Sequence, residues 1–152
     1  MPRITAFGKN VGGEDASLPG ISHCFRLHRG DDLKRSIQDY AKKHGIKASV
    51  IVSGVGCLSR ACIRDATGER SHTLAERLEI VSLTGTVGAE RTHLHIALAR
   101  EDLSVLGGHL LEGCTVNTTA EIVLLELPGW RFGKTFDETT GYDEIIMEEC
   151  EK

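Results

Sequence analysis

The segment THLHIALA (92–99) alternates polar or small residues with branched apolar residues from His93 onward. This period of two is typical of a β-strand with one buried face. His93 and His95 fall on the face away from the core, with Cα atoms about 6.5–7 Å apart. Both imidazoles therefore point the same way, at a spacing that lets them approach one ion. The opposite face supplies a core stripe made of Leu94, Ile96 and Leu98.

Segments of similar apolar and β-branched character lie on both sides of this strand and predict a sheet. Successive strands have no helical pattern between them, which favours a mostly antiparallel or mixed sheet over a doubly wound parallel one. We expect the fold class to be α/β (α+β) with one main amphipathic helix. The strands are expected over 22–28, 48–55, 58–66, 74–87, 93–99, 116–127 and 143–147.

One helix is predicted over 33–44, where Leu33, Ile37, Tyr40 and Ala41 share a face. An aspartate precedes it as a cap, and a glycine follows its basic last turn, which suits the helix dipole.

The 152 residues contain no repeat, linker or low-complexity block, so a single domain over 1–152 is predicted. The Gly-rich, polar start over 1–20 is expected to be a loop or loosely held arm. Turns are expected at 129–131 and 139–142.

The composition limits the partners and the compartment. The net charge is −4, and the basic runs at 34–35 and 42–43 lie among acidic residues, which argues against non-specific binding to nucleic acid. No segment approaches the ~18 apolar residues of a membrane-spanning helix, and 1–15 contains no apolar core of a signal peptide. We therefore expect a cytoplasmic protein without a membrane partner.

Five cysteines without a pairing pattern fit reduced thiols better than a disulfide framework. Cys57 and Cys62 form a C-x4-C pair that could hold zinc, although buried structural cysteine is the commoner outcome.

His109 follows Gly107-Gly108 after a turn-like segment over 100–106 that can return the chain beside THLHIALA. The glycines permit close backbone approach or positive φ, which would help to aim His109 at the ion of His93 and His95. Three imidazoles with an open position are a common zinc arrangement, while other transition metals stay open. The alternative is three structural histidines, or polar residues at a subunit interface.

Glu79 lies inside the apolar run 78–83, where a carboxylate needs a partner. It is the candidate catalytic acid or base, with three alternatives: a group supporting the metal, an ion-pair partner of Arg77 or Arg91, or an exposed edge residue.

Glu121 poses the same question as Glu79, and Glu112 is only three residues from His109. The polar segment 117–119 is expected to line a pocket or to face a neighbouring subunit.

Over about 25–144 the chain resembles the plant-and-prokaryote conserved (PPC, PD1-like) domain family. This resemblance implies a largely antiparallel sheet, a homotrimer, and a metal-binding unit on His93, His95 and His109. The site is also similar to that of acetolactate decarboxylase, a related superfamily type that holds zinc with three histidines. The resemblance is carried by RLHRGDDL (26–33), IVSGVGCLSRA (51–61), LEIVSLTGTV (78–87), HLHIALA (93–99), GGHLLEGCTVNTTAEIVLLEL (107–127) and FDETTGYDE (136–144).

Plant members of the family join this domain to AT-hooks, which are Arg-Gly-Arg-Pro segments. Here Arg-Gly occurs only at 29–30 and is followed by two aspartates, so DNA binding by this chain alone is not expected.

Two classes of function follow. The first is a binding or assembly module of a regulatory or DNA-associated kind, with a structural or ligand-sensing zinc ion and room for a small-molecule ligand. The alternative is a metal-dependent lyase or hydrolase acting on a small carbonyl or carboxylate compound.

Overall fold

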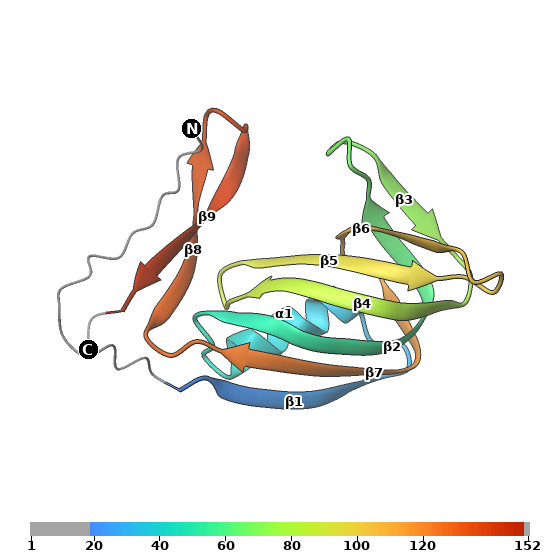
Figure 1. Ribbon diagram of the computed structural model, residues 1–152, viewed down its shortest axis with the longest axis horizontal. Helices are drawn as coiled ribbons and strands as arrows, with labels where there is room; N and C mark the ends of the chain where they lie inside the picture. The colour runs from blue at the N-terminus through green and yellow to red at the C-terminus, as the bar shows by residue number, and fades with distance from the viewer. Residues whose placement is uncertain (1–18, 151–152) are drawn as a thin grey trace.

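The computed structural model describes residues 19–150 (Figure 1). The arm expected over 1–20 lies outside this range except for Pro19 and Gly20, which have no regular secondary structure. The elements are β1 (Ile21–His28), α1 (Leu33–Lys43), β2 (Ser49–Arg64), β3 (Ser71–Leu74), β4 (Leu78–Val87), β5 (Thr92–Ala99), β6 (Val105–Leu110), β7 (Thr115–Glu126), β8 (Trp130–Asp137) and β9 (Tyr142–Glu149).

Seven of the strands form one sheet in the order β1-β7-β2-β4-β5-β6, with β3 added beside β2. Strands β8 and β9 form a separate hairpin (Figure 1). All the strand pairings within residues 19–150 are antiparallel, which confirms the predicted fold class.

Strand β2 is long and pairs with different neighbours along its length. Its first part lies between β4 and β7, whereas its last residues, Ile63 and Arg64, pair with Leu110 and His109 of β6. Register shifts against β7 fall within 51–60, at three places, and such irregularities bend a strand. Strands β2, β4, β5 and β6 therefore form a closed circuit of pairings.

Helix α1 packs across one face of the sheet (Figure 1). Its predicted apolar side is confirmed, because Leu33, Ile37 and Ala41 are fully buried. The side chain of Asp32 accepts a hydrogen bond from the backbone N–H of Arg35 at 2.9 Å, as an N-cap does. At 11 residues, the helix of the described range is too short to cross a membrane.

The other face of the sheet has no helix of the described range against it, and it carries exposed valines beside polar residues. Val52, Val55 and Val81 are 60%, 45% and 55% exposed. The three histidines also lie on this face.

Three expectations about the elements were wrong. The turn expected at 129–131 lies at 128–129, and Trp130 begins β8, which the sequence did not predict. The strand expected over 74–87 is interrupted at 75–77, and the two expected over 48–66 are joined in β2. The reason for β8 is long-range: Phe132 is buried, and its N–H donates to the carbonyl of Lys47 at 3.0 Å.

Candidate metal centre

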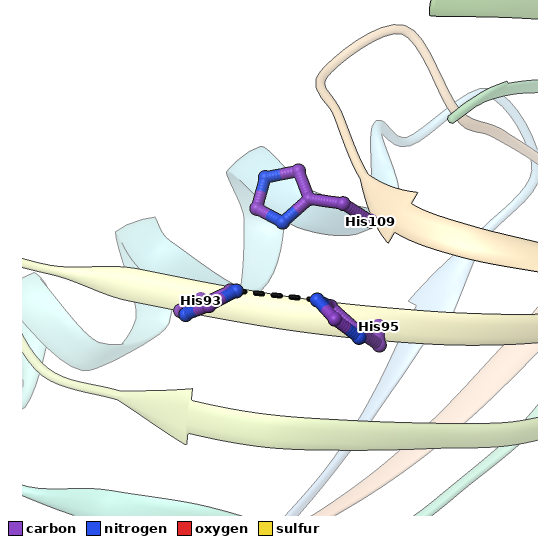
Figure 2. Close-up of side chains that lie close together, drawn as sticks. All are labelled: His93, His95 and His109. Atoms are coloured by element: carbon purple, nitrogen blue, oxygen red, sulfur yellow. Dashed lines mark hydrogen bonds between the residues drawn. The ribbon is translucent and has the colours of Figure 1, made fainter. Parts of the chain in front are cut away.

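The strand register brings the three histidines together. His109 of β6 is the direct partner of His95 in β5, and His93 lies two residues along the same strand. Directly paired residues of antiparallel strands present their side chains on one face, as do residues two apart in a strand. Figure 2 shows the three rings converging, with a ring nitrogen of His109 turned toward His93 and His95.

The distances suit a shared ion. The Nε2 atoms of His93 and His95 are 3.2 Å apart, and one nitrogen from each of the three rings lies within 4.8 Å of the others. Ligand nitrogens about 2.0–2.1 Å from a tetrahedral ion are roughly 3.3 Å apart. Small rotations about the histidine χ2 angles, which are loosely restrained, can bring the nitrogens from these separations to about 3.3 Å. Within residues 19–150, these three histidines are the one group of potential metal ligands whose donor atoms lie this close together.

Burial and nearby positive charge favour the neutral forms of His109 and His93. Burial lowers the pKa of His109 to about 4, with further contributions from the positive charges of Lys34 and Arg64. The pKa of His93 is lowered by burial and then by Arg91. Since a metal binds the neutral imidazole, His109 and His93 are in the form that a metal would bind near neutral pH.

One buried atom is a direct test of whether a metal fits. Nδ1 of His109 is buried and has no hydrogen-bond partner among residues 19–150. A buried polar atom without a partner is costly, and a coordinated ion removes that cost. The donor set of three imidazoles therefore fits a divalent transition metal.

The two glycines before His109 act through close approach. A Cβ atom on Gly107 would meet the carbonyl oxygen of Ile96, and one on Gly108 would meet that of Arg64. Neither glycine has a positive φ, so of the two roles expected for them, close backbone approach is the one observed. Strand β6 can lie this near both β5 and β2 only without side chains at these positions.

Glu79 is not brought to the histidines. It is exposed on β4 and pairs with Cys57 and Ala99, and Ala99 is four residues, about 13 Å of strand, from His95. Within the described range Glu79 makes no ion pair, so neither Arg77 nor Arg91 is its partner.

The other polar candidates are not members of the three-histidine group. Glu112 and Glu121 are exposed, and Glu121 faces Arg26 and Val55 across β7. The hydroxyl of Thr118 contacts the Cys57 thiol at 2.8 Å.

The C-x4-C pair does not form a metal group in the described range. All five thiols are free, and Cys62 makes its contacts with Cys114, whose Sγ lies 3.1 Å from the Cys62 backbone nitrogen.

Sequence reasoning missed the residues that surround the histidines. A cavity of about 270 Å³ beside them is lined by His93, His109, Arg64, Arg91, Tyr142 and Glu144, among others. Arg64 comes from the end of β2, and Tyr142 and Glu144 from β9. Only the register between β2 and β6, which Arg64↔His109 defines, could have revealed Arg64.

Comparison with protein-family models matches residues 15–128 to the Plants and Prokaryotes Conserved (PCC) domain. Over 123 residues the chain is 42% identical to the bifunctional protein GlmU of Synechococcus sp. (strain JA-2-3B'a(2-13)), which covers 81% of this chain. The matched region is 20% of that relative, so the chain spans about a fifth of the length of the GlmU proteins it matches.

Two solved structures have the same fold. A hypothetical protein from Salmonella enterica aligns with a TM-score of 0.83 and 31% identity, covering 89% of this chain and 97% of its own. The metal-containing protein AF0104 from Archaeoglobus fulgidus aligns with a TM-score of 0.74 and 33% identity, covering 86% and 96%.

Proposed function

Because the chain belongs to the Plants and Prokaryotes Conserved (PCC) domain family, we propose that it is a homotrimeric binding module that holds one zinc ion per chain. The ligands are His93, His95 and His109. The observation that carries the proposal is the convergence of three imidazoles from paired strands, one with a buried, partnerless nitrogen. The metal-containing description of AF0104 supports it.

Zinc is the ion that best suits this donor set. Three neutral nitrogens, without thiolate or carboxylate in the cluster, match a common three-histidine zinc arrangement. A zinc ion held by His93, His95 and His109 would supply Lewis-acid chemistry to a water or ligand.

The trimer is proposed from the family resemblance together with the face of the sheet opposite α1. Val52, Val55 and Val81 are exposed there, and no helix of the described range lies against them. Exposed apolar groups on one face favour association between copies, and soluble oligomers are usually closed and symmetric.

A binding module is favoured over the lyase or hydrolase alternative, because Glu79, the acid or base expected from the sequence, does not lie at the centre. Glu79 lies about 13 Å along the sheet from His95, beyond the reach of a group that must transfer a proton at the ion.

The test is metal analysis of untagged protein purified without chelator. We expect about one zinc per chain in the wild type and less than about a tenth of that in His93→Ala, His95→Ala and His109→Ala, because each loses one of three ligands.

The matched control is His72→Ala, since His72 is exposed and paired with Asp65 away from the cluster. This variant should keep its zinc. Full zinc content in all three ligand variants, measured on folded protein, would refute the centre.

A further inference from the structure

Two arginines stand beside the proposed metal centre without a counterion. Arg64 and Arg91 both line the cavity of about 270 Å³ that also contains His93 and His109. Within the described range neither arginine makes an ion pair. The cavity is therefore positively charged on the side of the histidines.

Arg64, at the end of β2, lies beside His109 of β6 and Tyr142 of β9. It is the direct partner of His109 across β2 and β6, so the two side chains leave the sheet on the same face. Its guanidinium carbon lies 5.9 Å from the centre of the Tyr142 ring, within the range of a cation–π contact. Its Nε is buried and has no hydrogen-bond partner among residues 19–150.

Arg91 has guanidinium N–H groups that are available to a ligand. Its Nη1 is buried without a partner among the described residues, and its Nη2 lies 3.3 Å from Nδ1 of His93. If Nε2 of His93, the atom that faces His95, binds the ion, then Nδ1 carries the proton and cannot accept from Arg91. A loaded centre thus frees the guanidinium to donate into the cavity.

The remaining charged groups around the cavity favour a ligand that carries a single negative charge. Lys34 adds a further positive charge near His109, while its ammonium donates to the Leu110 carbonyl at 3.0 Å. Glu144 also lines the cavity, close enough to His93 to raise its pKa slightly against the larger lowering effects. Its carboxylate would repel a second negative charge on a ligand. Asp143 is already paired with Lys134 at 2.9 Å.

We propose that this cavity binds a small carboxylate, with one oxygen on the metal and with Arg64 and Arg91 donating hydrogen bonds to the carboxylate group. The inference rests on the proposed metal centre. Guanidinium groups match the planar carboxylate in geometry, and the bond is charge-assisted. The volume is at or below the roughly 300–1,000 Å³ of ordinary ligand pockets, so a compact acid fits better than a large one.

The test is calorimetric titration of the zinc-loaded full chain with pyruvate, lactate and inorganic phosphate. We expect pyruvate or lactate to bind more tightly than phosphate. Arg64→Gln and Arg91→Gln should each weaken the binding about tenfold or more, because each removes charged donors. Zinc content should not change. Arg64→Lys and Arg91→Lys should weaken it less, because they keep the charge but lose the planar fork.

The matched control is Arg26→Gln, an exposed arginine on the far strand β1, which should bind like the wild type. Zinc content and an unchanged thermal midpoint report that each variant is folded.

The outcomes separate the two proposals. Wild-type protein that takes up no zinc overturns the metal centre and this inference together. A zinc-loaded protein that binds neither acid, or that binds them equally well in folded Arg64→Gln and Arg91→Gln, overturns this inference alone. Tighter binding of phosphate than of either acid overturns the carboxylate assignment.

Discussion

His109 combines burial with the charges of Lys34 and Arg64, which together lower its pKa to about 4. In an unfolded chain the pKa of histidine is about 6.5. Between these values the unfolded state binds more protons than the folded state, so acid favours unfolding in that window. Above pH ~6.5 both states are neutral at this position and the effect is absent.

We therefore expect the free energy of unfolding of chelator-treated, metal-free protein to fall as the pH is lowered from about 6.5 to about 4. The His109→Gln variant should lose less stability over this pH window. Part of the dependence of the free energy of unfolding on pH should remain, because the pKa of His93 is also lowered. Urea denaturation at several pH values measures this. An identical slope in His109→Gln and the wild type would contradict the lowered pKa.

Gly108 offers a second test at the scale of one atom. In Gly108→Ala the new Cβ meets the carbonyl oxygen of Arg64, which must push β6 away from β2. We expect a loss of about 1–3 kcal/mol in the free energy of unfolding and weaker zinc binding. In Gly133→Ala the nearest atom is Ile146 Cβ at 4.0 Å, so this control should leave zinc binding unchanged. Denaturation and metal titration of both variants measure the difference.

Local residue patterns explain which members of the site could be predicted from the sequence. His93 and His95 were predictable because their two-residue spacing fixes their common face locally. His109 was predictable because a glycine pair marks the close approach before it. Arg64 was not, because its place beside His109 depends on where the end of β2 meets β6. No local pattern encodes that register.

Helix α1 is joined to the sheet through its N-cap residue, Asp32. Asp32 caps the helix at the Arg35 N–H, and its other carboxylate oxygen accepts from the Gly113 N–H at 2.5 Å, in the loop before β7. We expect Asp32→Ala to lower the free energy of unfolding by about 1–2 kcal/mol or slightly more, because both bonds are lost.

The control is Asp39→Ala, an exposed position within the helix, which should change stability little. Urea denaturation measures both variants. Equal stability of Asp32→Ala and the wild type would mean that the cap contributes nothing.

At the scale of elements the sequence was informative where the pattern is local and long. The helix and the strands β1, β5 and β7 were placed within one or two residues of their observed ends. Strand β8 was missed because the segment Gly-Trp-Arg (129–131), where it begins, is typical of a turn. In addition, the contact that holds it, Phe132 to Lys47, joins distant segments. The joining of β2 across Gly56 likewise depends on its partners β4 and β7.

For the whole molecule we expect light scattering at micromolar concentration to give about three times the 16.5 kDa mass of one chain. The physical reason is the exposed apolar face around Val52, Val55 and Val81, which association removes from water. Val55→Glu and Val81→Glu should shift the mass toward one chain. A monomeric wild type would contradict the assembly.

Random duplex DNA is the second partner to test at this scale. The net charge of −4 offers few cations to replace the counterions of DNA, so we expect little or no binding at physiological salt. Fluorescence anisotropy over a range of salt concentrations measures this. Sub-micromolar binding that weakens steeply with salt would establish a DNA partner instead.

The closed circuit of β2, β4, β5 and β6 has a consequence for how an ion arrives. Because β6 is paired on both sides, His109 cannot swing away unless the ladder with β5 or β2 breaks. Folding alone therefore sets the ligands in place, and little conformational entropy is lost when the ion enters. For the proposed centre we therefore expect uptake to be a simple collision, whose observed rate rises linearly with ion concentration without the plateau that a slow rearrangement of the protein would impose.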